Sequence, residues 1–257
     1  MAVLRVNGLT KYFGINSVFE NVSFELKSGE HIGLVGANGA GKTTLLKCIM
    51  GREEADRGTI KTSEGAVIGY LRQDFDYAGE TIRDEMEEAW KDVLFYKDRM
   101  ERLAAELEFH KDDADLVLEY GKTEARFEFL GGYDYESATK KILTGLGFTE
   151  EDWDRDIHSF SGGQKVRINL AAAFVRHPDF LLLDEPTNHL DMGMLEWLED
   201  YLRSYKGGVL MISHDRYFLD AASTGIIDLE NHRIHSYRGG YTRYMDTKTR
   251  ETAAYEK

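Results

Sequence analysis

The stretch that decides the fold of this chain is Gly36-Ala37-Asn38-Gly39-Ala40-Gly41-Lys42-Thr43-Thr44. It fits the pattern GxxxxGK followed by Ser or Thr, in which glycines let consecutive backbone N–H groups close round a phosphate. The lysine reaches the terminal phosphate oxygens, and the next hydroxyl, that of Thr43, binds Mg²⁺. Such a loop needs a strand before it and a helix after it. The sequence supplies both, as an apolar run over 31–35 and a helical pattern over 42–50 that ends at Gly51.

Two later apolar runs, residues 180–183 and 209–212, are typical of strands buried on both faces. Each continues at its carboxyl end into polar residues, and ligands bind at that edge of open α/β sheets. The first run ends in Asp184 and Glu185. Phosphoryl transfer needs one acidic group for the Mg²⁺ shell and another group to orient or deprotonate the attacking water. We assign the first role to Asp184 and the second to Glu185.

The rest of the chain predicts two further kinds of structure. Residues 3–6 and 19–26 alternate apolar and polar side chains, which predicts antiparallel strands. Between residues 82 and 130, apolar side chains recur at alternating intervals of four and three residues, on either side of the polar break 110–113. This spacing is typical of coiled-coil seams rather than of core helices. We therefore expect an antiparallel helical hairpin that projects from the sheet.

The segment that begins at Ser161 predicts the N-terminus of a helix. Ser161 and Gln164 stand at the spacing of a capping box, which explains these two residues structurally. Gly162 and Gly163 leave backbone N–H groups uncovered at the positive end of the helix, as the binding of an anionic phosphate requires. Because the chain already has a phosphate loop, we expect this second anion site to serve a nucleotide held by another domain of the same kind.

The composition narrows the possible classes of function. The 257 residues include 46 acidic and 32 basic side chains, a net charge of −14, which argues against a protein that coats nucleic acid. No apolar run approaches the ~20 residues of a membrane helix, so no membrane insertion is expected. The first residues lack the pattern of a secretory signal. With a single cysteine, Cys48, these features favour a cytoplasmic protein.

Several motifs, in their order along the chain, resemble those of the ATP-binding cassette (ABC) family. They are the phosphate loop 36–44, the glutamine of 70–73, the signature 160–164, and residues 183–186, 190–191 and 213–215. The runs DEPTNHLD at 184–191 and SHDRYFLD at 213–220 are more specifically similar to the ABC-F subfamily. Members of that subfamily are soluble twin-cassette ATPases associated with ribosomes, and the hairpin resembles their arm.

The resemblance implies a P-loop nucleotide-binding domain of the α/β class. It would have an N-terminal antiparallel β subdomain, a helical subdomain and the arm as an insertion. We expect the ATPase domain at 1–240, the arm at about 81–131, and the start of an interdomain linker helix at 241–257. One phosphate loop and one signature make half of a pair of composite sites, so a second cassette is the expected partner.

The resemblance also implies roles for single residues. Phe13 would stack on adenine, Glu185 would be the catalytic base, and His214 would contact the γ-phosphate. Gln73 would sense Mg²⁺ and the attacking water, and Asp191 would lie at the dimer seam. Contacts to ATP would come from Phe13, Gly36, Asn38, Gly39, Ala40, Gly41, Lys42, Thr43, Thr44, Ser161, Gly162, Gly163 and Gln164. The Mg²⁺ ligands would be Thr43, Gln73 and Asp184.

These expectations favour an Mg-dependent ATPase cassette whose closure on ATP switches ribosome association, with hydrolysis as the reset. Two alternatives stay open, the nucleotide-binding subunit of a membrane transporter and a non-hydrolysing, nucleotide-dependent scaffold. The hairpin and the pair Asn188-His189 argue against the transporter subunit. The intact Glu185 argues against the scaffold.

The arm segment carries most of the excess charge of the chain. Residues 74–134 hold 19 acidic and 8 basic side chains, a net of −11. Such a surface repels phosphates, so we expect the arm to dock on a basic ribosomal protein. The alternative is a solvated helical pair kept in solution by its carboxylates. Contact with RNA would then fall to the linker, whose first basic residues include Arg243, Lys248 and Arg250.

Overall fold

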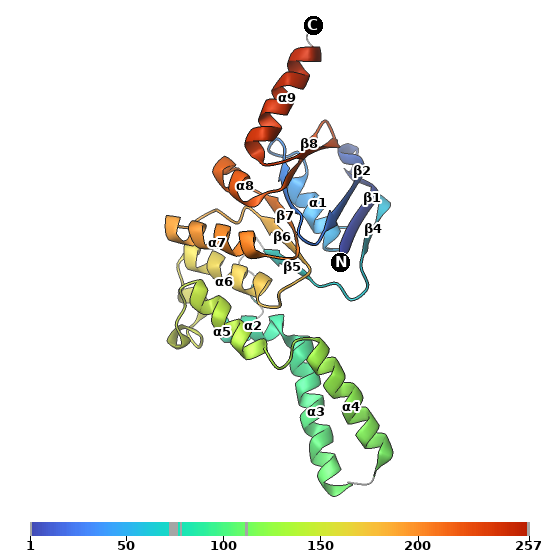
Figure 1. The fold of residues 1–257 in the computed structure, drawn as a ribbon, viewed down its shortest axis with the longest axis vertical. Coiled ribbons are helices and arrows are strands. Elements are labelled where there is room, and N and C mark those ends of the chain that lie inside the picture. The colour runs from blue at the N-terminus through green and yellow to red at the C-terminus, as the bar shows by residue number, and fades with distance from the viewer. Residues whose placement is uncertain (1, 72–76, 78, 111–112, 256–257) are drawn as a thin grey trace. The chain divides into compact units, whose positions relative to one another are not determined.

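The chain forms two compact units. The computed structural model describes residues 2–71, 77, 79–110 and 113–255. Unit 1 joins residues 1–75 to residues 177–257, and unit 2 consists of residues 76–176. Unit 1 combines strands and helices, whereas unit 2 is helical (Figure 1). The α/β class expected from the sequence is confirmed.

A six-stranded sheet forms the centre of unit 1, with the strand order β5-β6-β7-β3-β8-β9. The strands are β5 (Ile68–Leu71), β6 (Phe180–Asp184), β7 (Gly208–Ile212), β3 (His31–Val35), β8 (Gly225–Glu230) and β9 (Arg233–Arg238). All are parallel except β9, which pairs antiparallel with β8. Every residue of β6 and β7 is buried, as their continuous apolar runs predict.

Unit 1 also contains a three-stranded antiparallel sheet, with the order β2-β1-β4. Its strands are β1 (Val3–Phe13), β2 (Asn16–Lys27) and β4 (Arg57–Thr62). One set of alternating side chains, including Leu4 and Phe24, joins a buried core shared with the following helix α1 (Lys42–Ile49) and the parallel sheet. The antiparallel strands are confirmed, and they are longer than the alternating runs because a short turn at 14–15 joins them directly.

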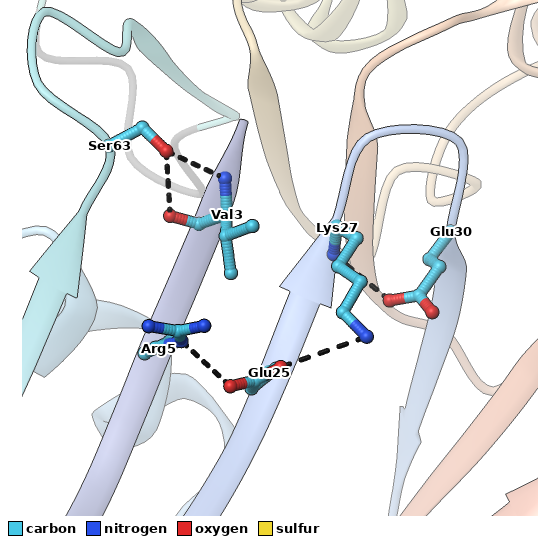
Figure 2. A network of polar contacts seen from close by, with 6 residues as sticks. All are labelled: Val3, Arg5, Glu25, Lys27, Glu30 and Ser63. Carbon is cyan, nitrogen blue, oxygen red and sulfur yellow. Dashed lines mark hydrogen bonds and ion pairs between the residues drawn. The ribbon is translucent and has the colours of Figure 1, made fainter. Parts of the chain in front are cut away.

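Polar contacts on the exposed side of this sheet link the strand ends (Figure 2). Arg5 Nε donates to Glu25 Oε1 at 2.7 Å from the directly opposite position on β2. The backbone N–H of Val3 donates to the Ser63 hydroxyl at 2.9 Å, which ties the start of β1 to the end of β4. Exposed ion pairs contribute little stability. The register itself is set by the alternation of buried and exposed side chains, and these contacts are compatible with it.

The remaining helices of unit 1 follow the strands of the parallel sheet. They are α7 (Met192–Ser204), α8 (Arg216–Ala222) and α9 (Tyr241–Tyr255). The helical character expected at 241–257 is therefore found over α9. No helix in the part of the chain that the structure describes is long and apolar enough to cross a bilayer.

Unit 2 contains helices and short 3₁₀ turns. The helices are α2 (Ile82–Ala89), α3 (Lys91–Phe109), α4 (Ala114–Phe129), α5 (Tyr135–Gly145) and α6 (Gly162–Phe174), and the 3₁₀ turns are Glu150–Asp152 and Ile157–Ser159. The hairpin is formed by α3 and α4, which lie side by side (Figure 1). Val93 and Leu103 of α3 and Thr123 and Phe127 of α4 are buried along it. The seam predicted between two helices is thus present.

The first predicted seam is not one continuous helix. It is interrupted at Trp90, which ends α2 and precedes α3 with a non-helical φ of −101° and ψ of 12°. The Trp90 side chain is buried, and its Nε1–H donates to the Thr139 hydroxyl of α5 at 2.9 Å. Ile82 and Met86 are buried in α2, which packs on α6. The interpretation of these two residues as part of a coiled coil is wrong, because they belong to the helical core of unit 2.

Candidate functional site

The phosphate-loop motif connects β3 to α1 in unit 1. Gly36 has a φ of 150°, and a Cβ at this position would meet the carbonyl oxygen of Leu229 at 2.5 Å. Gly41 has a φ of 100°, and its Cβ would meet Val18 Cγ1 at 2.4 Å. Only glycine fits at these two positions. α1 begins at Lys42 with no capping side chain and no acid in its first turn, so its N–H groups are available to an anion.

The Lys42 side chain is folded over the same loop. Its Nζ donates to the carbonyl oxygens of Gly36 at 2.8 Å and of Ala37 at 2.9 Å, and the residue is buried. An ammonium group is a donor only. Phosphate oxygens brought into the loop would therefore be alternative acceptors for the same group.

A pocket of about 400 Å³ opens beside the loop. It is lined by Phe13, Val18, Asn38, Gly39, Gly41, Lys42, Thr43 and Thr44. The Phe13 ring is 52% exposed, and Lys11 Nζ lies 5.0 Å from its centroid. The fold thus brings the end of β1 and the phosphate loop to one cavity of the size that small-molecule ligands occupy. Gly36 and Ala40 face a second cavity of unit 1, of about 490 Å³, which His214 also lines.

Asp184 ends β6 and is only 2% exposed. Neither of its carboxylate oxygens has a hydrogen-bond partner of normal geometry among the described residues. Burial raises the pKa of this carboxyl, while the nearby Thr43 hydroxyl acts in the opposite direction. A buried carboxylate beside a hydroxyl, with its lone pairs unused, offers the oxygen ligands that Mg²⁺ prefers. Asp184 and Thr43 therefore fit the binding of this cation.

Glu185 follows in a left-handed backbone conformation with a φ of 53°. Its carboxylate contacts His214 twice, since Oε1 lies 3.3 Å from the imidazole Nε2 and Oε2 accepts the backbone N–H at 3.3 Å. The Glu185 side chain is 11% exposed, whereas that of His214 is 63% exposed. Left-handed backbone in a glutamate costs of order 1–3 kcal/mol. The surrounding contacts hold this strained conformation, which fixes the carboxylate at the end of the sheet.

Neighbouring loop residues support this arrangement. The Ser213 hydroxyl lies 3.2 Å from that of Thr187 and accepts the backbone N–H of Asp215 at 3.0 Å. Asp191 accepts the N–H of Met194 at 3.0 Å and so caps the N-terminus of α7. This cap gives Asp191 a structural role within unit 1, and its expected place at a dimer seam stays a prediction.

In unit 2, the segment around Ser161 forms the predicted capping box. The Ser161 hydroxyl accepts the N–H of Gln164 at 3.3 Å, and the Gln164 side chain accepts the N–H of Ser161 at 2.9 Å. Ser161 and Gly162 are exposed, and no atom lies within 4 Å of a Cβ built on Gly162. The N-terminus of α6 is therefore open on one side, as the paired glycines predict. Gln73 lies outside the described residues.

Sequence reasoning missed the role of Asp228 and the ion pairs of Lys248. Asp228 is a buried carboxylate in β8, 2% exposed, and it accepts the hydroxyl of Tyr244 at 2.8 Å and the ammonium of Lys248 at 2.5 Å. Lys248 also lies 2.9 Å from Glu230. Its charge is therefore engaged within unit 1, and its contact with RNA stays a prediction. The sequence does hold one signal for the role of Asp228, because it is a single acidic residue within the otherwise apolar run 226–229.

Comparisons with known proteins agree with this geometry. The family model described as ABC transporter matches residues 19–188. ABC transporter F family member 5 of Arabidopsis thaliana is 36% identical over 264 residues, which are 99% of this chain and 38% of that protein. The energy-dependent translational throttle protein EttA of Mycobacterium tuberculosis is 32% identical over 244 residues, which are 95% of this chain and 43% of that protein.

A solved structure, described as the structure of the ATP binding subunit of an ABC transporter, has the same fold. Its TM-score is 0.70 at 23% identity, and the match covers 92% of this chain and 90% of that one. The chain spans about two fifths of the length of the two curated relatives. The chain belongs to the ATP-binding cassette family, is built as an ATP-binding cassette, and has ABC-F members among its relatives.

Proposed function

We propose that this cassette binds ATP with Mg²⁺ and hydrolyses it to ADP and phosphate. Lys42 and the N–H groups of the loop and of α1 would hold the phosphates, and Phe13 would lie against the adenine. Thr43, Asp184 and Gln73 would hold Mg²⁺. When bound, this ion would neutralise negative charge on the phosphates.

The observation that carries the proposal is the position of the Glu185 carboxylate. It follows the buried Asp184 directly and is fixed by two contacts to His214. A general base must be held within hydrogen-bond reach of the water whose proton it takes. Glu185 would accept that proton, and the His214 imidazole would keep the carboxylate oriented and contact the γ-phosphate.

A second cassette would complete the site. The chain has one phosphate loop, in unit 1, and one Ser161-Gly162-Gly163 signature, at the open N-terminus of α6 in unit 2. The signature N–H groups would bind the γ-phosphate of a nucleotide held by the other cassette. The partner would be the rest of a longer protein or a second copy. Specific ATPase activity should then rise with protein concentration, and constant activity in a protein that stays monomeric with ATP would contradict the composite site.

The cellular process would be translation. Closure of two cassettes on ATP would switch association with the ribosome, in the cytoplasm, and hydrolysis would reset it. The name of the relative EttA, a translational throttle protein, supports this proposal. So does the arm, whose net acidic surface exposes Phe109 (83%), Val117 (52%) and Leu118 (57%) near the turn between α3 and α4. Apolar side chains among carboxylates suit a basic protein surface better than RNA.

Glu185→Gln tests the chemistry and the cellular role together. The amide keeps the volume of the side chain but cannot accept the proton, so turnover should fall by about 10²- to 10⁴-fold while ATP binding persists. Glu64→Gln is the matched control, because Glu64 is an exposed carboxylate in the turn between β4 and β5. Turnover of the Glu185 variant at the control rate would remove Glu185 from the mechanism.

The same variant separates ribosome from membrane association. With ATP it should stay closed and co-sediment with ribosomes more than the wild type does, since hydrolysis is the proposed reset. Co-sedimentation with membranes instead, in the full-length protein, would favour a transporter subunit. ATP-dependent ribosome binding without measurable hydrolysis by the wild type would favour the scaffold.

A further inference from the structure

Unit 2 contains a cavity that the proposed ATPase chemistry does not use. Its volume is about 500 Å³, and it lies among α2, the start of α3, α5 and the 3₁₀ turn at 150–152. Three of its lining residues form an apolar floor, since Met86 is 3%, Trp90 5% and Leu143 0% exposed. A cavity of this size with an apolar floor can take an inserted side chain or a small ligand.

The rim of the cavity is charged, and the balance is acidic. Arg83 lines it, but its guanidinium donates to Asp154 at 2.6 and 3.0 Å, and Asp154 is not part of the lining. Lys140 lines it too, and is paired at 2.5 Å with the lining residue Glu150. Both cations are therefore already neutralised by carboxylates.

Two further carboxylates of the rim are paired more weakly. Glu87 is exposed and forms no direct ion pair among the residues that the structure describes, although it lies near enough to Arg83 to interact with its charge. Glu136 accepts the hydroxyl of Tyr135 at 2.7 Å and forms a long ion pair with Lys97 at 3.7 Å. A guest with a positive charge would find two acceptors here.

The aromatic walls of the cavity already hold cations of the protein itself. The Arg83 guanidinium lies 5.6 Å from the ring centroid of Trp153, and Lys97 Nζ lies 5.2 Å from that of Tyr135. Attraction between a cation and an aromatic face strengthens where water is excluded. These two ring faces are occupied, so a further cation at the rim would be held by carboxylates rather than by the rings.

We propose that this cavity receives an arginine side chain from a basic segment of a partner protein. The alkyl stem would lie on the apolar floor, as stems of long cationic side chains do. The guanidinium would donate to Glu87 and Glu136, and its several N–H groups can reach two separate carboxylates, whereas an ammonium is a compact point charge. The net charge of −11 over 74–134 would steer a basic segment towards the site.

This inference rests on the proposed ribosome association for its biological meaning only, because basic protein segments are what the arm would meet there. Its test needs neither ATP nor ribosomes, so it can fail or succeed independently of the ATPase. The probe is a capped tri-arginine peptide, titrated at low salt into the nucleotide-free protein. The indole N–H resonance of Trp90 reports on the cavity, and calorimetry gives the dissociation constant.

We expect the peptide to shift the Trp90 resonance, and a matched tri-citrulline peptide, which lacks the charge, to leave it unchanged. Glu87→Gln/Glu136→Gln should raise the dissociation constant about tenfold, because two charge-assisted hydrogen bonds are lost. Glu101→Gln/Glu108→Gln is the control, since it removes the same charge from exposed positions of α3 outside the cavity. It should change the constant less than about twofold by weaker steering alone.

Three results would overturn the proposal. The first is binding of the citrulline peptide as tightly as the arginine peptide. The second is an equal loss of affinity in the two double variants, which would mean that only the overall acidity of unit 2 matters. The third is binding of the arginine peptide without any shift of the Trp90 resonance, which would put its site elsewhere.

Discussion

Tyr244→Phe tests how firmly α9 is held on unit 1. The Tyr244 side chain is 5% exposed, and its hydroxyl donates to the buried carboxylate of Asp228 at 2.8 Å. Phenylalanine keeps the ring and removes only this donor. Asp228 would then keep Lys248 as its charged side-chain partner.

The magnitude follows from this geometry. A hydrogen bond to a charged group contributes about 1.5–3 kcal/mol. Asp228 lines the cavity of about 490 Å³ in unit 1, so water that replaces the lost donor there would bring the loss towards the smaller value. The opening of α9 should therefore become easier by that amount. Amide protection over α9 should fall by roughly 10- to 150-fold in hydrogen exchange.

Tyr241→Phe is the matched control. Tyr241 lies on the same helix, and its ring packs against that of Tyr244 at a centroid distance of 5.6 Å. No hydrogen bond of its hydroxyl is found among the described residues, so its variant should exchange as the wild type does. Equal exchange of α9 in the wild type and in Tyr244→Phe would refute the reasoning. So would an equal effect of the two variants, because ring packing rather than the hydroxyl would then hold the helix.

Two further predictions concern stability. Burial lowers the pKa of His31, so the unfolded state binds a proton more readily, and stability should fall as pH drops below about 6.5 by up to ~1.4 kcal/mol per pH unit. His31→Gln should flatten the pH dependence of chemical denaturation relative to the exposed control His235→Gln, and parallel profiles would contradict this. Gly36→Ala should lower the melting temperature more than Gly29→Ala. Both glycines have a positive φ, so alanine at either position costs about 1–3 kcal/mol in backbone strain. Of the two, only Gly36 would also bring the added Cβ against a backbone atom, 2.5 Å from the carbonyl oxygen of Leu229. Equal losses would show that the close approach is unimportant.

The sequence by itself determined the local elements and their chemistry. The phosphate loop follows a buried strand and starts a helix, because glycine spacing and apolar runs report backbone conformations over a few residues. The capping box of Ser161 and Gln164 was predictable for the same reason. The seam between α3 and α4 follows from the periodicity of the segment, which any helical hairpin must satisfy.

Contacts between distant segments were decided by the tertiary structure alone. Glu185 and His214 meet because β6 and β7 are neighbours in the sheet, which no pattern within either strand encodes. The break at Trp90 depends on Thr139 of α5, since the heptad-like spacing continues through it undisturbed. Nothing in the sequence indicates which acidic residue Lys248 contacts. The packing of α9 on β8 brings it to Asp228. Local propensity determines which helices and strands form. Buried polar groups need hydrogen-bond partners, and the segments that supply those partners are set by the tertiary structure.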